Sequence, residues 1–159
     1  MYKRQFLERS KADTVYICAT NLCDGSVVDY AQETKKIKLS HDFYQDIVAS
    51  AKYIGKRYRY SKVHAQYITD LALEIFDKTK KFHGLTQRDR LILEISAILH
   101  DIGKYVNLND PGKNGYQLII STEIMGLSHR EREEVANIVL YNTQELPDTD
   151  ELDTAFWRE

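Results

Sequence analysis

Three residues have the side chains and the spacing that chemistry would need: the adjacent His100 and Asp101, and His64 further upstream. The adjacent pair ends residues 90–101, whose apolar positions repeat with helical spacing, so one face of this stretch must be buried. An imidazole and a carboxylate beside such a face need a hydrogen-bond partner, a counter-charge or a metal ion, because desolvating them alone is costly. This pair is therefore the first candidate for a functional site.

A metal site is one interpretation of these residues. His64 is expected in the first turn of another helix, so it could converge with His100 and Asp101 in one cleft. Nitrogen and carboxylate ligands suit Mn, Fe, Mg or Zn, and such a metal polarises a phosphoryl oxygen or activates water. In the alternative interpretation, His100 and Asp101 make structural hydrogen bonds and His64 is a cap or surface residue. Spacing alone leaves both open.

The second candidate is the segment 52–62, KYIGKRYRYSK, which carries five basic residues and three tyrosines. Basic groups with aromatic neighbours suit a polyanion such as polyphosphate, a nucleotide or RNA. The alternative is a solvated helix end whose tyrosines pack on the next helix. Three further cations flank the proposed cleft, so the candidate polyanion-binding residues are Lys52, Lys56, Arg57, Arg59, Lys62, Lys104, Lys113 and Arg130.

Composition limits the class of protein. The 159 residues fit one compact domain with a small appendage, and the net charge of −2 argues against a dedicated DNA-binding protein. Cys18 and Cys23 form no disulfide framework and are expected to be small buried residues in a reduced protein. The amino-terminal residues lack a signal-peptide core, and no run approaches the ~18 apolar residues of a membrane span. These features predict a soluble cytoplasmic protein without a membrane partner.

The pattern of caps and breakers predicts a mainly α domain of five or six helices. Helices are expected over residues 41–53, with Ser40 as N-cap and Gly55 as the end, over 62–80 after Ser61, after Thr86, over 116–126, and over 128–141. Residues 107–115 are expected to form a loop. At the amino terminus, a strand over 14–19 and an Asp24–Gly25 turn before Val27 and Val28 predict a small β-hairpin.

Several motifs then follow one another in a familiar order. They are His64 followed by Ala65, LALEIFD over 71–77, HGL over 83–85, ILHDIG over 98–103, YQLI over 116–119, GLSHRE over 126–131 and Leu146 before Pro147. This order resembles the HD domain of the exopolyphosphatase/guanosine pentaphosphate phosphatase (Ppx/GppA) family. NLCDGSVVDY over 21–30 looks like the segment in which that family's actin-like fold ends.

The resemblance implies an HD-type helical bundle over residues 31–159 and a remnant of an actin-like domain over 1–30. The chain would then be a fragment of a longer protein whose upstream domains hold the catalytic residues and Mg²⁺. No catalytic residue is assigned to this chain, and the fragment alone is expected to be inactive. Its role would be to bind polyphosphate or a guanine nucleotide and to support a homodimer. Without the upstream sheet, the strand edge at residues 15–17 is expected to self-associate.

Departures from the family pattern count against an active HD site in this chain. Residues 111–115 replace a histidine-rich stretch, Asn142 and Thr143 replace a His-Arg pair, and the last aspartate ligand of HD proteins would lie beyond Glu159. His64, His100 and Asp101 are therefore a partial ligand set, a degenerate HD site. The alternatives are an autonomous metal-dependent HD phosphohydrolase acting on a nucleotide, and a structural dimerisation module without a ligand.

Overall fold

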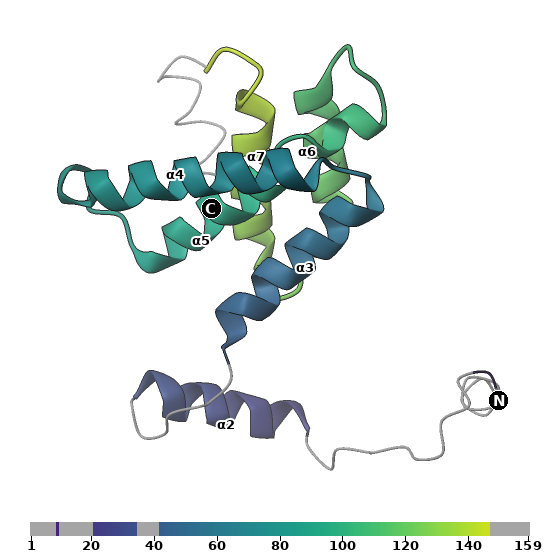
Figure 1. Cartoon of the computed structure of the whole chain (residues 1–159). Coiled ribbons are helices and arrows are strands. Elements are labelled where there is room, and N and C mark those ends of the chain that lie inside the picture. The colour runs from purple at the N-terminus through teal and green to yellow at the C-terminus, as the bar shows by residue number, and fades with distance from the viewer. Residues whose placement is uncertain (1–8, 10–20, 35–41, 147–159) are drawn as a thin grey trace. The chain divides into compact units, whose positions relative to one another are not determined.

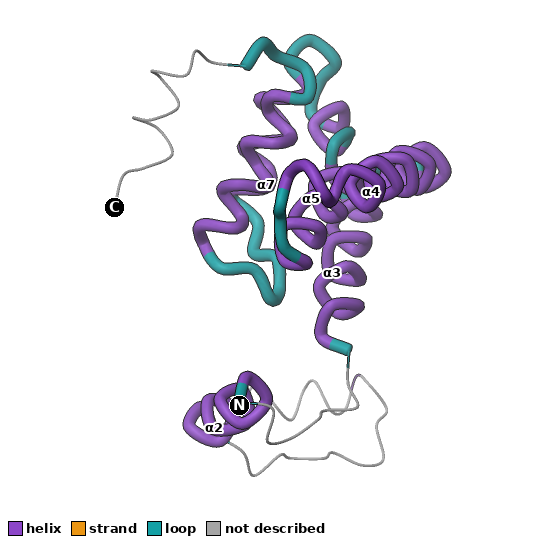
Figure 2. The backbone as a smooth tube through the Cα atoms, turned by 90° about the vertical axis from the view of Figure 1, so that its left-hand side faces the viewer, coloured by secondary structure: helices purple, strands orange, loops and turns teal. Residues whose placement is uncertain are grey.

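The computed structural model describes residues 9, 21–34 and 42–146, and all regular structure within these residues is helical (Figures 1 and 2). The prediction of a mainly α fold is therefore confirmed for them. The chain divides into two units, residues 1–41 and residues 42–159. None of the described helices is long and apolar enough to cross a lipid bilayer.

In the first unit the predicted β-hairpin is wrong, because helix α2 (Leu22–Glu33) runs through the expected turn and second strand. Asn21 and Asp24 begin this helix reciprocally: the Asn21 N–H donates to Asp24 Oδ2 at 2.9 Å, and the Asp24 N–H donates to Asn21 Oδ1 at 3.0 Å. This exchange satisfies free donors of the first turn, which outweighs the weak helix propensity of Gly25. The predicted strand and its edge at residues 14–19 lie outside the described residues. Cys23 is exposed, contrary to the prediction, and Cys18 is not among the described residues.

The described part of the second unit, residues 42–146, contains five α-helices and one short 3₁₀ helix. In chain order they are α3 (Phe43–Arg57), α4 (Lys62–His83), α5 (Gln87–Leu99), η1 (Ile102–Tyr105), α6 (Pro111–Ile120) and α7 (His129–Tyr141). Helix α5 lies at the centre and packs against α3, α4 and α7, while α6 packs against α7 and η1 (Figure 1). Seven α5 residues are buried, so this helix supplies much of the core.

The helix ends that depend on local capping were predicted correctly. The Ser61 side chain caps α4, and Gly84 ends that helix in the left-handed conformation at φ 65°. Thr86 and Asp89 form a capping box at the start of α5, and Ser128 begins α7 in the same way. Capping needs only residues within one turn, so its sequence pattern is reliable.

Other helix boundaries differ from the prediction. Asp42, whose side chain accepts a hydrogen bond from the Tyr44 N–H, caps α3, whereas Ser40 had been expected to do so. Helix α3 continues past Gly55 to Arg57, and a Cβ at Gly55 would lie only 3.1 Å from the Tyr60 ring, which packs against this glycine. Helix α6 begins at Pro111, inside the predicted loop. Proline is favoured at the first helical position, where its missing N–H costs nothing.

Two glycines allow η1, α6 and α7 to approach closely. A Cβ at Gly103 would lie 1.8 Å from the Pro111 carbonyl oxygen, and a Cβ at Gly112 would lie 2.3 Å from Thr143 Oγ1. Neither contact tolerates a side chain, because the first neighbour is backbone and the second is a short side chain. The position of η1, and with it the residues that flank Gly103, is therefore set by contact with the start of α6.

A polar network joins α3, α4 and α5. Arg90 donates to both carboxylate oxygens of Asp77 at 2.9 Å and to the Tyr44 hydroxyl at 3.3 Å. The Tyr44 hydroxyl in turn donates to Glu94. Burial and the neighbouring Glu94 carboxylate raise the pKa of Tyr44 to about 12, so the hydroxyl remains a donor at neutral pH.

A second polar contact joins the first turns of α5 and α7. Arg88 Nη2 donates to Glu131 Oε2 at 2.9 Å and to the Gly126 carbonyl at 2.8 Å. Glu131 also accepts the Ser128 N–H at 2.8 Å. The hydrogen bond from the Arg88 guanidinium is the main cause that lowers the pKa of Glu131 to about 2, and hydrogen bonds from Ser128 lower it further. Burial acts in the opposite direction. The contact therefore stabilises the fold through the ionised carboxylate.

We predict that Glu131→Gln lowers the free energy of unfolding by about 1 kcal/mol at neutral pH. The folded-state pKa lies below the ordinary value of 4.5, so this contribution is complete above pH 4.5 and is lost as the pH falls towards 2. Urea unfolding of both proteins at several pH values measures it. Glu133→Gln, a change at an exposed position on the same helix, is the control. A difference between wild type and Glu131→Gln that did not change between pH 7 and pH 2 would contradict the prediction.

Candidate functional site

The structure brings His64, His100 and Asp101 together from separate elements. His64 lies in the first turn of α4, His100 follows the last turn of α5, and Asp101 precedes η1. One potential ligand atom from each lies within 4.8 Å of the other two, and the two imidazole rings are 5.2 Å apart between centroids. The side chains of His100 and Asp101 are 12% and 17% exposed, whereas that of His64 is 49% exposed. The cluster is therefore open to solvent on the His64 side.

The hydrogen bonds of this cluster fit a divalent metal. His100 Nδ1 lies 2.7 Å from the Ala97 carbonyl and donates to it, which leaves Nε2 as the ligand atom, 3.5 Å from Asp101 Oδ1. Metal-binding histidines commonly donate their other ring N–H in this way. His64 Nε2 lies 3.8 Å from Asp101 Oδ2. Two nitrogens and a carboxylate form a partial ligand set that water molecules would complete.

Lys104 is the immediate competitor for such a metal. Its ammonium group lies 2.8 Å from both Asp101 oxygens and is half exposed. A metal ion would have to share Asp101 with this charge or displace it. The same ammonium group, placed beside the two histidines, also gives the cluster a donor for an anionic ligand.

The basic segment 52–62 lies beside this cluster. It comprises the end of α3, the connection and the first residue of α4, and its five cations are exposed. Tyr58 contacts Tyr105 of η1 edge to face, with ring centroids 5.6 Å apart, which joins the segment to the element that carries Lys104. Tyr58 and Tyr60 are partly buried against the core, so the tyrosines also have the packing role of the alternative interpretation.

The remaining predicted cations differ in their placement. Lys113 lies in the first turn of α6, whose start packs against η1, so it is at the same end of the unit as Lys104. Arg130 is in the first turn of α7 and pairs with Glu134 at 3.5 Å. The α7 start contacts the opposite end of α5, about 18 Å from His100 along that helix. The structure does not bring Arg130 to the cluster.

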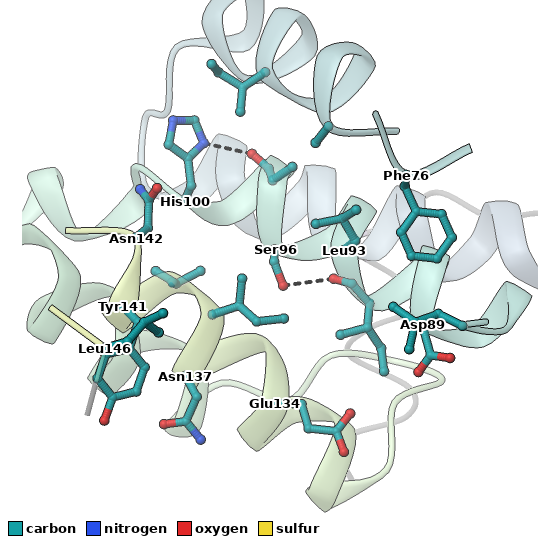
Figure 3. Close-up of a pocket in the computed structure, with 17 residues that line it drawn as sticks. Phe76, Asp89, Leu93, Ser96, His100, Glu134, Asn137, Tyr141, Asn142 and Leu146 are labelled. Atoms are coloured by element: carbon teal, nitrogen blue, oxygen red, sulfur yellow. Dashed lines mark hydrogen bonds between the residues drawn. The ribbon is translucent and has the colours of Figure 1, made fainter. Parts of the chain in front are cut away.

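Sequence reasoning missed two cavities next to these residues. A small cavity of about 160 Å³ is lined by Lys52 and Lys62 together with Glu94. A larger one, of about 680 Å³, lies between α4, α5 and α7 and has His100 at one end (Figure 3). The only sequence signal for the larger cavity is the apolar spacing on three separate helices, and spacing does not reveal which faces are left uncovered.

The sequence of this unit matches one known protein family. The family model described as Ppx/GppA phosphatase, domain III, matches residues 48–155. The chain belongs to this family. Residues 48–155 of this Ppx/GppA domain III include both histidines of the cluster, Asp101, the whole basic segment 52–62 and the larger cavity. No curated protein matches the chain.

We predict near-stoichiometric binding of one of Mn, Fe, Zn or Mg to this Ppx/GppA domain III, measured as metal content after incubation and gel filtration. His64→Ala and His100→Ala are expected to lower metal affinity by at least about 10-fold, because each removes a ligand atom. His129→Ala is the matched control, since His129 bonds Arg132 away from the cluster. Metal content equal to background in the wild type would leave His100 and Asp101 as structural residues.

Proposed function

We propose that this chain is the polyanion-binding domain of a Ppx/GppA-type phosphatase, with polyphosphate as the ligand. In this proposal hydrolysis and its Mg²⁺ belong to the actin-like domains of the parent protein. The observation that carries the proposal is the Tyr58–Tyr105 contact, which joins the basic segment 52–62 to η1 and Lys104. This contact supports the proposal that the cations of the segment and Lys104, although they come from separate elements, bind one polyanion.

The charges of this surface favour a long anion. None of the five cations in segment 52–62 makes an ion pair with another residue that the structure describes. The Arg57 guanidinium lies over the Tyr58 ring, 5.8 Å from its centroid. Stacking uses the face of the guanidinium, so its N–H groups remain available to an anion. Polyphosphate carries a charge on each unit, so binding would depend strongly on salt through release of counterions, as for nucleic-acid phosphates.

The proposal includes a homodimer, and α4 supports this part of it. Four of its apolar residues, Val63, Tyr67, Leu71 and Ile75, are 44–83% exposed. These residues recur every fourth position and so form one stripe along the helix. An exposed apolar stripe of this length is typical of an interaction surface. The stripe continues along α4 away from Lys62, the last cation of segment 52–62, so one helix would serve both roles.

We predict that the triple variant Lys56/Arg57/Arg59→Ala binds polyphosphate at least about 10-fold more weakly than wild type at low salt. The slope of log affinity against log salt concentration should fall by about two, the share of three phosphate contacts on a flexible polyanion. Fluorescence anisotropy with labelled polyphosphate measures both quantities.

The matched control is Lys78/Lys80/Lys81→Ala, which removes three positive charges from the far end of α4. Equal loss of affinity in both variants would show that net charge alone governs binding, and would contradict a defined surface. No retention of polyphosphate by wild type would favour a structural dimerisation module without a ligand.

A second candidate function is an autonomous metal-dependent phosphohydrolase that acts on a nucleotide. It is favoured by the convergence of His64, His100 and Asp101 within 4.8 Å. These three residues would hold the metal, which would supply a polarised phosphoryl oxygen or an activated water. Lys104 is placed to contact a phosphate beside them, through an ammonium group that is half exposed.

The two candidates differ in the activity expected of the pure chain. Under the first, no phosphate is released from polyphosphate or from guanine nucleotides at any metal concentration. Under the second, phosphate release depends on added metal and is lost in His100→Ala, while His129→Ala keeps it. A malachite-green assay on the three proteins decides between them, and metal-dependent release by wild type would contradict the first candidate.

A further inference from the structure

The small cavity beside the basic segment 52–62 is lined by residues of α3, α4 and α5 and has a volume of about 160 Å³. Ala65, Thr69 and Ile98 are each only 3% exposed and give it a buried wall. One water occupies about 30 Å³ of the liquid, so the cavity has room for about five waters, or for one phosphate group with its nearest waters. Sites for nucleotide-sized ligands are larger, at about 300 Å³ or more.

The charged side chains that line this cavity are not paired with one another. Lys52 of α3 and Lys62 of α4 form no ion pair with a carboxylate in the part of the chain that the structure describes. Glu94 of α5 lines the same cavity, and its side chain is 14% exposed. Two ammonium groups and one carboxylate therefore line a common space without closing it by direct contact.

The two carboxylate oxygens of Glu94 have different surroundings. Oε2 accepts a hydrogen bond from the Tyr44 hydroxyl and lies 3.9 Å from Arg90 Nη1. Oε1 has no hydrogen-bond or ion-pair partner among the described residues. A largely buried acceptor of this kind is stabilised by a ligand that donates a proton to it.

This set of groups distinguishes between anions of the same shape. An anion attracted by the two ammonium groups also meets the Glu94 carboxylate, and their repulsion opposes binding unless the anion donates a hydrogen bond. Monohydrogen phosphate and the protonated end of a phosphate chain carry such a hydroxyl, whereas sulfate carries none at neutral pH. A site built to hydrogen-bond a hydroxyl rejects an analogue that lacks it.

We propose that this cavity binds one phosphate group that carries a proton. Lys52 and Lys62 donate to its charged oxygens, and Glu94 Oε1 accepts its hydroxyl. The group is either free orthophosphate or the terminal unit of a phosphate chain, because both present the same hydroxyl. Only the second case rests on the proposed binding of polyphosphate. Internal units of a chain lack the hydroxyl and would stay on the exposed cations.

The test compares orthophosphate with sulfate at pH 8 and constant ionic strength, where both are tetrahedral ions with about two negative charges. The backbone amides of Ala65, Thr69 and Ile98, followed by NMR during titration, report on the cavity directly. In wild type we expect phosphate to bind at least about 10-fold more tightly than sulfate. Equal affinities for the two ions, or no response of these amides to phosphate, would overturn the proposal.

Glu94→Gln removes the carboxylate charge and keeps a side chain of the same size beside the Tyr44 hydroxyl. The preference for phosphate over sulfate should fall to about 1 in this variant, while sulfate affinity should not decrease, because the repulsive charge is gone. Glu133→Gln, the same change at an exposed position on α7 outside the cavity, is the control and should keep the preference. A preference that persists in Glu94→Gln would overturn the proposal.

A second variant leaves the Tyr44 contact intact. Lys52→Gln, at an exposed position, should weaken the binding of both ions by at least about 5-fold, because it removes a charge-assisted donor. Lys81→Gln, which changes an exposed lysine in the last turn of α4, is its control and should leave both affinities unchanged. An equal effect of the two lysine variants would contradict a site in the cavity.

Linear and cyclic phosphates identify the source of the bound group. Tripolyphosphate has two terminal units, whereas cyclic trimetaphosphate has none. If chain ends bind, tripolyphosphate should displace orthophosphate from the cavity and trimetaphosphate should not; if free orthophosphate is the ligand, neither should displace it. Either result supports the site, and equal displacement by both would overturn it.

Failure of this inference is distinguishable from failure of the proposed function. Retention of polyphosphate without a response of the cavity amides would overturn the inference and leave polyphosphate binding by the exposed cations in place. A phosphate-selective response of these amides without retention of polyphosphate would support the site and contradict the proposed function.

Discussion

The burial of α5 is the constraint on which the second unit depends. Leu91, Ile95 and Leu99 are at most 2% exposed, and neighbouring faces of the same helix contact α3, α4 and α7. Polar contacts of α5 with α7 are made by Arg88 at its start, and those with α3 and α4 by Arg90 and Glu94 further along the helix. His100, which follows the last turn, is one of the three residues of the candidate metal site.

Close backbone contacts then position the residues that follow α5. Gly103 touches the start of α6, and Gly112 touches the end of α7, so η1 has little freedom to move. Asp101 and Lys104 flank Gly103 and lie 2.8 Å apart between carboxylate and ammonium group. The geometry of the cluster is thus a consequence of packing between small residues, at positions that carry no functional group themselves.

Both candidate functions of this domain use Lys104. With Asp101 it forms an ion pair at the edge of the metal-ligand cluster, and through η1 it neighbours Tyr105 and the basic segment 52–62. A polyanion would bind to the positive charge of Lys104. A metal ion would instead need the Asp101 carboxylate, with which Lys104 is paired. Membership of the Ppx/GppA phosphatase domain III family is compatible with the first use, and the partial ligand set is compatible with the second.

Local features were predictable from the sequence, and features that depend on distant partners were not. Ser61, Thr86 and Ser128 were identified as caps because their hydrogen bonds stay within one turn. The Asp24–Gly25 turn was wrong because the same residues also begin a helix, and no sequence rule ranks the two outcomes without knowing whether a partner strand is present. Pro111 was assigned to a loop for a similar reason, since it serves equally as the first residue of α6.

The sequence by itself determined the family and the mainly helical fold, and it supplied the candidate residues for a metal or anion site. Only the tertiary structure decided which of these residues meet. It brought His64 to His100 and Asp101, left Arg130 at the other end of α5, and left an apolar stripe of α4 exposed. Periodicity shows that a helix has an apolar face, but the neighbours that cover the face lie elsewhere in the chain.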